Sequence, residues 1–320
     1  MSSEGDFIAL MRNLAHTTAA RGLMDDAAVL DIAALSDGSL VLTSDTLVEG
    51  VHFLETDPAD SVGWKLAAVN LSDLAAKGAR PVGCLMNYAL SGDAIWDAEF
   101  AKGLSTALTR YDMALLGGDT VAMPTGAPRS MTLTAIGRVA AGASVPSRSG
   151  AQAGDVLYVT GPVGDAGAGL KLLAAGQNEP QALVDAYRRP QPRLDAGFAL
   201  APHAHAMMDI SDGLLIDAQR MAQASGVAII VNHVPISAPY RALDGDSQSA
   251  LIEAACAGDD YQLLIAWPAD QPLPPDSDLI RIGRVGAGAG LALEIGGRPV
   301  ALPERLGWQH GDTPSQAPTN

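Results

Sequence analysis

Basic side chains are scarce in this sequence. Its 320 residues include 20 Lys and Arg against 36 Asp and Glu, which gives a formal net charge of -16. Proteins that bind nucleic acid neutralise the backbone phosphates with Lys and Arg, so this balance argues against nucleic acid as a partner. It also disfavours an anionic substrate, unless metal ions reverse the local field. Solubility alone is the competing explanation of the acidic excess.

Cysteine and long apolar runs are also rare. The two cysteines, Cys84 and Cys256, stand in apolar surroundings without CxxC spacing, so we expect buried core thiols and no disulfide framework. Such usage suits a reducing cytoplasm. Residues 1–6 do not form a basic segment that leads into an apolar one, so no signal peptide is expected. No apolar run is long enough to span a bilayer.

Several nucleotide-binding motifs are missing as well. The sequence has no GxxxxGK[ST] loop, no kinase HRD or DFG set, and no GxGxxG fingerprint at a strand–helix junction. These absences argue against the common nucleotide-binding classes.

Short blocks of Asp with Gly, Ser, Thr and Asn are what the sequence does have, and most follow an apolar run where a strand would end. Mg²⁺ takes oxygen ligands at short range and keeps several waters, so it needs a few carboxylates with room around them. The blocks therefore predict a site with several Mg²⁺ ions that handles phosphates. They are Met24–Ala28, Thr43–Thr46, Asn70–Asp73, Gly117–Thr120, Asp209–Gly213 and Gly258–Tyr261.

The order of expected elements predicts an α/β or α+β protein with two domains. Apolar patterns predict strands at 39–44, 82–90, 112–116 and 130–139, with helices at 60–79 and 94–110. A linker rich in Gly, Ser and Ala is expected at 141–154. The pattern then restarts, with strands at 155–160, 205–210, 227–232, 260–267 and 279–285 and helices at 165–175 and 192–201. We expect domains at 1–140 and 150–310, followed by a disordered tail at 311–320.

Each Asp block also has a purely structural explanation. Ser211 or Asp212 could be an ordinary helix N-cap, and the other blocks could be turns. Asp73 is the most informative exception, because Asp is a poor helix former and this residue lies mid-helix among Ala and Leu. It shares a helix face with Asn70 and Lys77, and a buried carboxylate needs a partner, which a metal or Lys77 would supply.

Taken in order, the blocks resemble the thiamine-monophosphate kinase family, of the superfamily that includes aminoimidazole ribonucleotide synthetase. The matching stretches span nearly the whole chain, and the second and third are the most specific. They are Asp25–Leu30 (DDAAVL), Thr43–Phe53 (TSDTLVEGVHF), Ala68–Ala79 (AVNLSDLAAKGA), Gly117–Thr120 (GGDT), Ser147–Gly150 (SRSG), Asp209–Leu214 (DISDGL), Gly258–Leu263 (GDDYQL) and Gly307–His310 (GWQH).

The resemblance implies a two-domain synthetase-like fold, with an N-terminal α/β domain that forms a homodimer through its sheet and a C-terminal α/β domain that closes over the site. It implies transfer of the γ-phosphoryl group of ATP to thiamine monophosphate, giving thiamine diphosphate. The implied roles follow the motifs. Mg²⁺ would be bound by Asp26, Thr43, Ser44, Asp45, Asp73, Asp119, Asp209 and Asp212; ATP by Gly118, Asp119, Arg148 and Ser211; the thiamine substrate by His52, Asp259 and Trp308.

The attacking group in that reaction is a phosphate oxygen that is already anionic. No covalent nucleophile or general base is therefore expected, and we predict direct in-line transfer without a phosphoenzyme. Three departures from the family pattern stand out: Met24 precedes the first Asp pair where Gly is usual, Asp259 replaces a Glu, and Gly311 follows His310 where an aromatic is usual.

Two alternatives stay open at the level of sequence. One is another ATP-dependent member of the superfamily, such as a selenophosphate synthetase or an aminoimidazole ribonucleotide synthetase. Selenophosphate synthetases carry a reactive Cys or selenocysteine near the N-terminus, whereas the first cysteine here is Cys84, in an expected core strand. The other alternative is a non-catalytic binder of nucleotides or thiamine phosphates.

Overall fold

The computed structural model describes residues 4–23, 38–275 and 277–309. The chain divides into two compact units. Unit 1 comprises Met1–Ser147, Arg188–Asp209 and Pro272–Ser277, and unit 2 comprises Arg148–Tyr187, Ile210–Gln271 and Asp278–Asn320. Each unit combines helices and strands, which confirms the mixed α/β class predicted from the sequence.

Unit 1 is built on a four-stranded sheet with the order β1-β4-β2-β3. Its strands are β1 (Gly38–Val48), β2 (Arg80–Leu90), β3 (Ala114–Ala122) and β4 (Ser130–Ala140). β4 pairs antiparallel with β1 and β2, whereas β2 and β3 are parallel. The parallel pair is joined by a helical crossover, as parallel strands require.

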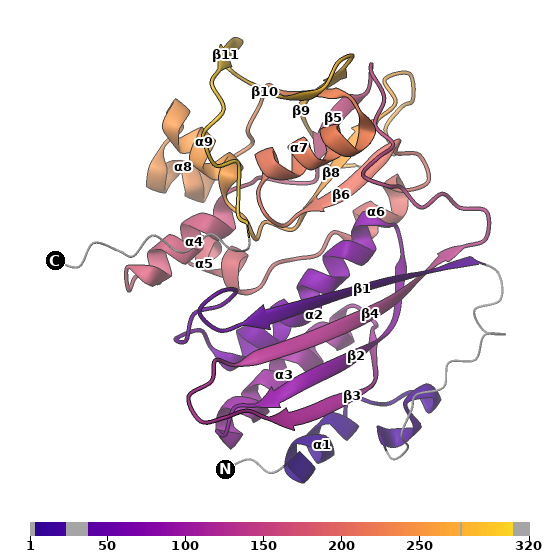
Figure 1. Cartoon of the computed structure of the whole chain (residues 1–320), viewed down its shortest axis with the longest axis vertical. Coiled ribbons are helices and arrows are strands. Elements are labelled where there is room, and N and C mark those ends of the chain that lie inside the picture. The colour runs from indigo at the N-terminus through magenta and orange to yellow at the C-terminus, as the bar shows by residue number, and fades with distance from the viewer. Residues whose placement is uncertain (1–3, 24–37, 276, 310–320) are drawn as a thin grey trace. The chain divides into compact units, whose positions relative to one another are not determined.

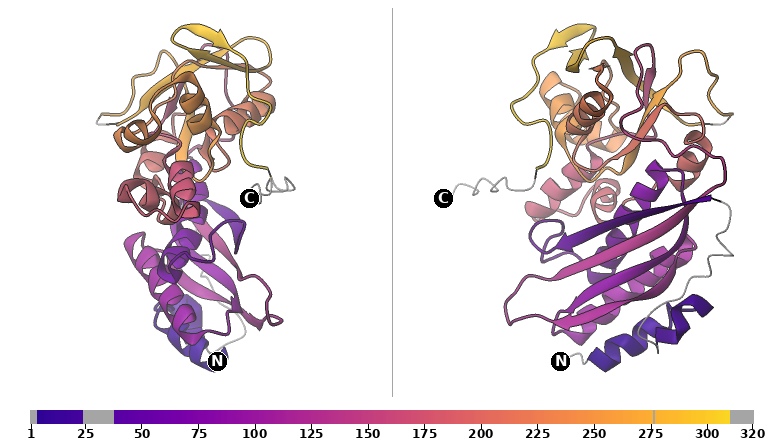
Figure 2. Two further views of the ribbon diagram at one scale, coloured as in Figure 1. Left: turned by 90° about the vertical axis from the view of Figure 1, so that its left-hand side faces the viewer. Right: turned by 45° about the vertical axis from the view of Figure 1, so that its right-hand side comes forward.

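Helices α2 (Ala59–Ala76) and α3 (Ala94–Arg110) lie on one face of this sheet (Figure 2). α2 is apolar on nearly every side, and 16 of its residues are buried. A helix that is buried all round fits between a sheet and a second helix. Gly63 of α2 and Gly103 of α3 allow this packing, since a Cβ at Gly103 would come 1.8 Å from the backbone oxygen of Asp60.

The opposite face of the sheet carries exposed apolar side chains. Leu40 and Leu42 of β1, Leu85 of β2 and Val121 of β3 are 38–63 % exposed. The strand register and the alternation of side chains along a strand put all four on the face away from α2. We call this surface the open face. An exposed apolar area of this kind is typical of an interaction surface.

Unit 2 contains most of a seven-stranded sheet with the order β11-β10-β7-β9-β5-β8-β6 (Figure 1), and the boundary between the units falls within β6. Its strands are β5 (Val156–Val159), β6 (Ala206–Ile210), β7 (Ala228–Val231), β8 (Gln262–Trp267), β9 (Ile280–Gly286), β10 (Gly290–Ile295) and β11 (Arg298–Val300).

The remaining helices of the described residues belong to both units. Those of unit 1 are α1 (Glu4–Arg12), the short 3-10 helix η1 (Thr18–Leu23) and α6 (Leu194–Leu200). The others are α4 (Asp165–Ala174), α5 (Gln181–Arg188), α7 (Leu214–Ser225), α8 (Ala238–Asp244) and α9 (Gln248–Cys256).

Most expected elements are present within a few residues of their predicted bounds. Two expected strand ends are wrong. The strand placed at 39–44 continues to Val48, so the Thr43–Thr46 block lies inside β1. The strand placed at 112–116 continues to Ala122, so the Gly117-Gly118-Asp119 block lies inside β3. β3 continues because its parallel pairing with β2 resumes after a bulge between Cys84 and Leu85. Cys84 is fully buried as predicted, whereas Cys256 is only partly buried. Asp26 and the tail at 311–320 lie outside the described residues.

Within the described ranges, we find no helix that combines the length and the apolar character needed to cross a membrane.

Candidate functional site

The helix-facing side of β1 carries the first cluster of predicted site residues. Thr43 and Asp45 are two positions apart on the strand, so their side chains lie on the same face. The Thr43 hydroxyl donates a hydrogen bond to Oδ2 of Asp73 on α2. The backbone N–H of Asp45 donates to Oδ1 of Asn70, one turn earlier on α2, at 3.1 Å. β1 and α2 therefore bring together Thr43, Asp45 and Asp73.

Asn70 fixes this arrangement. Its side chain is fully buried, and its amide nitrogen donates to the carbonyl oxygen of Leu66 at 3.0 Å. With the amide held in this orientation, Oδ1 faces the backbone of β1 at Asp45. Asn70 thus sets the register between helix and strand on which the pairing of Thr43 with Asp73 depends.

Asp209, at the end of β6, joins the same cluster through Ser72. The buried Ser72 hydroxyl donates to Oδ2 of Asp209 at 2.8 Å. Both residues belong to unit 1, although 137 positions separate them in sequence. Lys77, one turn further along α2, donates to the carbonyl oxygens of Pro146 and Met207. α2 therefore presents Asn70, Ser72, Asp73 and Lys77 to three separate chain segments.

The structure places two other predicted metal ligands on the open face. The Ser44 side chain alternates with Thr43 and Asp45, and its hydroxyl bonds the Thr134 hydroxyl at 2.9 Å. Asp119 is exposed, and the register aligns it with Asn87 on the open face. Its Oδ1 accepts from the N–H of Thr120. Ser44 and Asp119 are therefore not brought together with Asp73.

Gly118 has a structural reason to be glycine. Its φ is +154°, and a Cβ on it would lie 1.8 Å from the carbonyl oxygen of Met86 on β2. The block around it thus permits the close approach of β3 to β2. This requirement exists whether or not the backbone here also contacts ATP.

His52 lies in the turn that follows β1. Its Nδ1 accepts a hydrogen bond from the backbone N–H of Val48 at 3.1 Å, so the neutral ring carries its proton on Nε2. The buried Lys65 of α2 donates to the carbonyl oxygen of His52 at 3.0 Å. The turn is thereby fixed at both the side chain and the backbone of His52.

Unit 2 carries a second cluster, in the loop between β6 and α7. Asp217, which is completely buried on α7, accepts from the backbone N–H groups of Ser211 and Asp212 at 3.2 and 3.1 Å. Nη1 of Arg220 donates to Oδ2 of Asp212 at 2.5 Å and to Oδ1 of Asp217 at 2.7 Å. Burial raises the pKa of Asp217 to about 6, against the opposing effect of Arg220. Gly213 is the N-cap of α7, so the N-cap explanation of Ser211 and Asp212 is wrong.

The loop before β8 packs on the same segment. The N–H of Asp259 donates to the carbonyl oxygen of Ser211 at 2.7 Å, and the N–H of Tyr261 donates to that of Ile210 at 2.8 Å. Asp259 has a φ of 68° and Tyr261 one of 48°, a conformation that non-glycine residues rarely adopt. The Tyr261 hydroxyl donates to Oδ1 of Asp259 at 3.0 Å. Such strained backbone gathers at functional sites.

Trp308 completes this second cluster. Its backbone N–H donates to the carbonyl oxygen of Asp212 at 2.9 Å, and the residue is 38 % exposed. Gly307 precedes it because a Cβ there would lie 2.4 Å from that same oxygen. Ser211, Asp212, Asp259 and Trp308 therefore lie on three loops that are joined by backbone hydrogen bonds. Arg148 is exposed, and its carbonyl oxygen accepts from Ser225.

Asp260 anchors the loop of Asp259 to the start of α4. Its carboxylate accepts from the N–H groups of Gly164 at 2.7 Å and Ala166 at 3.5 Å, at the first turn of α4. Loss of hydration raises the pKa of Asp260 well above its usual value, and the neighbouring Asp165 and Asp259 raise it further.

Within the described residues, no group of three or more His, Cys, Asp and Glu side chains could hold a metal ion by itself. The donors of the first cluster nevertheless have the right chemistry for Mg²⁺, since Thr43, Asp45, Asp73 and Asp209 all present hard oxygen atoms. They fit a metal that keeps several waters and takes further oxygens from substrate phosphates. The assignment of individual ligands remains a prediction.

Sequence reasoning missed three residues of these clusters. Ser72 lies within the matched stretch Ala68–Ala79 without an expected role, yet it carries the bond to Asp209. Asp217 and Arg220 lie outside the Asp blocks, although their i, i+3 spacing near the start of a helix that follows such a block is a readable signal. They determine the position of Asp212.

Comparison with known proteins identifies the class first. The family model "AIR synthase related protein, N-terminal domain" matches residues 24–139, and "AIR synthase related protein, C-terminal domain" matches residues 152–296. The two matches together cover most of the chain, so this is a two-domain protein of the AIR synthase related class.

Individual relatives within this class identify the family. The thiamine-monophosphate kinase of Caulobacter vibrioides is 37 % identical over 327 residues, which cover 97 % of this chain and 91 % of that protein. The solved thiamine-monophosphate kinase of Stenotrophomonas maltophilia K279a is 37 % identical with a TM-score of 0.79, and the match covers 92 % of this chain and 96 % of that one. AaThiL complexed with AMPPCP and TMP is 32 % identical with a TM-score of 0.77, covering 96 % of both chains. The chain belongs to the thiamine-monophosphate kinase family.

Proposed function

We propose that this protein is an ATP-dependent kinase that converts thiamine monophosphate to thiamine diphosphate. The observation that carries the proposal is the Thr43, Asp45, Asp73 and Asp209 cluster, held in place by Asn70 and Ser72, in a chain 37 % identical to a thiamine-monophosphate kinase over 97 % of its length. The related AaThiL structure contains an ATP analogue and TMP together, which supports the same pair of substrates here.

Repulsion between the two substrates is the main obstacle to this reaction. Two unit charges 4 Å apart cost about 4 kcal/mol at an effective dielectric near 20, and several charges meet in this case. Mg²⁺ ions, when bound, would supply the positive charge that offsets this repulsion. We assign these ions to oxygen ligands of eight residues, and the carboxylates among them account for part of the acidity of the chain. The residues are Asp26, Thr43, Ser44, Asp45, Asp73, Asp119, Asp209 and Asp212.

Arg220 has a distinct part in the unit 2 cluster. It shares two hydrogens of one guanidinium nitrogen between Asp212 and Asp217, so the Asp212 carboxylate is fixed in position before any ligand arrives. Preorganised charge of this kind needs no rearrangement during reaction.

The thiamine substrate is assigned to His52, Asp259 and Trp308. A partly exposed indole face suits a cationic heterocycle, and Trp308 is tethered to the Asp212 backbone. ATP is assigned to Gly118, Asp119, Arg148 and Ser211. Asp259 is one methylene shorter than the usual Glu, and its unusual backbone conformation offers a way to present the shorter side chain.

The attacking phosphate oxygen is anionic already, so the chain has to orient the two phosphates in line and needs no base. We therefore expect no phosphorylated protein during turnover. Rapid-quench sampling with γ-labelled ATP measures this directly, and label on the protein at a level that rises and falls within one turnover would contradict direct transfer.

We also propose that the protein is a homodimer joined through the open face. Leu40, Leu42, Leu85 and Val121 give that face the apolar character of an interface. A cytoplasmic location suits the two free thiols of Cys84 and Cys256. Light scattering on the purified protein measures the mass in solution. The double change Leu42→Glu with Leu85→Glu should lower this mass to that of a monomer if the open face is the interface. Ile95→Glu, an exposed control on α3, should leave the mass unchanged.

The rival superfamily reactions are less well supported. Burial raises the pKa of Cys84 to about 12, so this fully buried thiol is poorly suited to be a reactive nucleophile. The discriminating experiment incubates the protein with ATP, Mg²⁺ and one acceptor at a time: thiamine monophosphate, selenide or formylglycinamidine ribonucleotide. Formation of thiamine diphosphate alone supports the kinase, a product from another acceptor supports a rival, and tight binding without any product supports a non-catalytic binder.

A further inference from the structure

The turn between β1 and α2 carries His52, the side chain that the proposed function assigns to the thiamine substrate (Figure 1). The backbone N–H of Gly50 donates to the carbonyl oxygen of Phe53 at 2.8 Å, which closes the turn on itself. The N–H of His52 donates to the carbonyl oxygen of Val48 at 2.9 Å, and the Val48 N–H donates to Nδ1 of the His52 ring at 3.1 Å. The position of the imidazole therefore follows the position of the turn.

Lys65 holds this turn from the side of α2. Its ammonium group donates a hydrogen bond to the carbonyl oxygen of His52 at 3.0 Å, although the residue is only 2 % exposed. An ammonium group is costly to bury, and a hydrocarbon side chain of similar length would fill the same place on an apolar helix at lower cost. A charge-assisted hydrogen bond is stronger than a neutral one. The ammonium thus supplies what hydrocarbon cannot, a strong bond to the backbone of His52.

A second contact fixes the start of the turn, at the residue that precedes β4. The backbone N–H of Glu49 donates to the carbonyl oxygen of Arg129 at 2.9 Å. The Glu49 carboxylate accepts from the backbone N–H of Arg129 at 2.9 Å and from its Nη1 at 3.1 Å. The guanidinium carbon of Arg129 lies 4.6 Å from the centre of the Trp96 ring on α3. Both charged side chains are less than a quarter exposed, so solvent screens their attraction only in part.

We infer that Lys65 and the pair of Glu49 with Arg129 are positioning residues for the thiamine substrate, which act through the His52 turn. The inference rests on the proposed function, since the role of His52 is part of it. All of these contacts lie within unit 1. The residues assigned to ATP lie outside this turn. Loss of either contact should therefore weaken the binding of thiamine monophosphate and spare that of ATP.

Steady-state kinetics of the full-length protein test the inference. Lys65→Met keeps most of the hydrocarbon of the side chain and removes the ammonium group. We expect it to raise KM for thiamine monophosphate by about tenfold or more and to keep KM for ATP within about twofold of the wild type. Arg129→Gln should raise KM for thiamine monophosphate by about threefold or more, again with little change for ATP. Calorimetric titration with thiamine monophosphate measures the same changes as dissociation constants.

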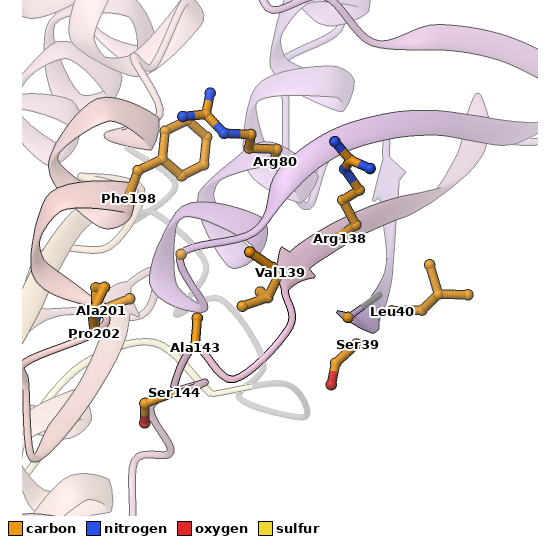
Figure 3. Close-up of a pocket in the computed structure, with 13 residues that line it drawn as sticks. Ser39, Leu40, Arg80, Arg138, Val139, Ala143, Ser144, Phe198, Ala201 and Pro202 are labelled. Atoms are coloured by element: carbon orange, nitrogen blue, oxygen red, sulfur yellow. The ribbon is translucent and has the colours of Figure 1, made fainter. Parts of the chain in front are cut away.

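Val139→Ala is the control for loss of stability alone. Val139 is 5 % exposed and pairs with Ser39, at the end of β1 away from the turn (Figure 3). This change should lower the melting temperature and leave both KM values at the wild-type level. Destabilisation lowers the active fraction of the protein, and hence the maximal rate, but not the affinity of the molecules that are folded.

A double-mutant cycle with His52→Ala identifies the path of the effect. Once the imidazole is absent, Lys65→Met should not raise the dissociation constant for thiamine monophosphate any further. Additive effects of the two changes would show that Lys65 does not act through His52, which overturns the inference.

The outcomes separate this inference from the proposed function. Where the wild type forms thiamine diphosphate, an unchanged KM for thiamine monophosphate in Lys65→Met, or equal rises for both substrates, overturns the inference alone. Where the wild type binds thiamine monophosphate without forming product, the dissociation constants replace KM in the same comparison. If Lys65→Met does not fold, an unchanged value in Arg129→Gln overturns the inference in the same way. A wild type that neither binds nor phosphorylates thiamine monophosphate contradicts both the proposed function and this inference.

Discussion

The bridge that Arg220 forms between Asp212 and Asp217 gives a prediction whose size follows from the structure. Arg220→Gln removes two charge-assisted hydrogen bonds of 2.5 and 2.7 Å. Bonds of this type contribute about 1.5–3 kcal/mol each when well shielded. The Arg220 side chain is 33 % exposed and Asp212 is 27 % exposed, so solvent screening reduces that arm, whereas Asp217 is fully buried. Asp217 also keeps its two backbone N–H donors in the variant.

We therefore expect Arg220→Gln to lower the free energy of unfolding of unit 2 by about 2 kcal/mol. Urea denaturation, followed by tryptophan fluorescence and by circular dichroism, measures this loss. Arg241→Gln is the matched control, because its pair with Asp246 has a separation of 3.5 Å and both side chains are more than half exposed. An exposed pair of that kind contributes about 0.5 kcal/mol or less.

A double-mutant cycle decides whether the cause is the bridge itself. Asp217→Asn combined with Arg220→Gln should show a coupling energy of about 1 kcal/mol or more, since each single change removes the same bond. Equal losses for Arg220→Gln and the Arg241→Gln control, or additive effects within the cycle, would refute the reasoning. Equal losses would mean that the bridge contributes no more than an exposed ion pair, and additive effects would mean that Arg220 does not pair with Asp217 in solution.

Three further outcomes follow from the same structure. Asp73→Asn should reduce turnover by at least about 100-fold and weaken Mg²⁺ binding in calorimetry, while the melting temperature stays close to that of the wild type; near-normal activity at saturating Mg²⁺ would exclude a ligand role. Because the folded state holds a proton on Asp260 more tightly than the unfolded state does, wild-type stability should fall as pH rises above about 4. The unfolding free energy of Asp260→Asn relative to the wild type should then rise by up to about 1.4 kcal/mol per pH unit in that window, and two parallel curves would contradict this. Gly118→Ala should cost about 1–3 kcal/mol, since its Cβ would meet the Met86 oxygen, whereas Gly142→Ala, with a positive φ but open space, should cost less; equal losses would show that the clash is relieved.

The first cluster was predictable in part from the sequence. Asp73 interrupts an apolar helix, and Thr43 and Asp45 alternate on a strand, so the side-chain faces could be read from the two periodicities. The contact between them could not be read, because it depends on the buried amide of Asn70 that sets helix against strand. The bond from Ser72 to Asp209 joins residues 137 positions apart, and no local pattern determines such a contact.

β3 shows why strand ends are hard to place. A run of Gly117 and Gly118 usually signals a break, and the sequence therefore predicted that the strand stops at 116. The parallel pairing with β2 carries the strand through both glycines to Ala122. This extension puts Asp119 on the open face. Local propensity was overridden by pairing with a neighbouring strand, which is a tertiary effect.

The unit 2 loops show the opposite case. The Asp209–Gly213 and Gly258–Tyr261 blocks were recognised as motifs, and either one could have been an ordinary turn. The structure joins them through two backbone hydrogen bonds, from Asp259 to Ser211 and from Tyr261 to Ile210. Both donors have positive φ, which a side-chain pattern does not reveal. The motif residues were thus identifiable, whereas the strain that positions Asp259 was not.

We propose that this chain transfers the γ-phosphoryl group of ATP directly to thiamine monophosphate. The most direct measurement uses ATP labelled in the γ-phosphate, with Mg²⁺ and thiamine monophosphate, and follows the label by chromatography over a single turnover. Direct transfer predicts that the label passes into the terminal phosphate of thiamine diphosphate in amounts equal to the ADP formed, and that Asp73→Asn abolishes this transfer. Label released only as inorganic phosphate, with thiamine monophosphate unchanged, would contradict it.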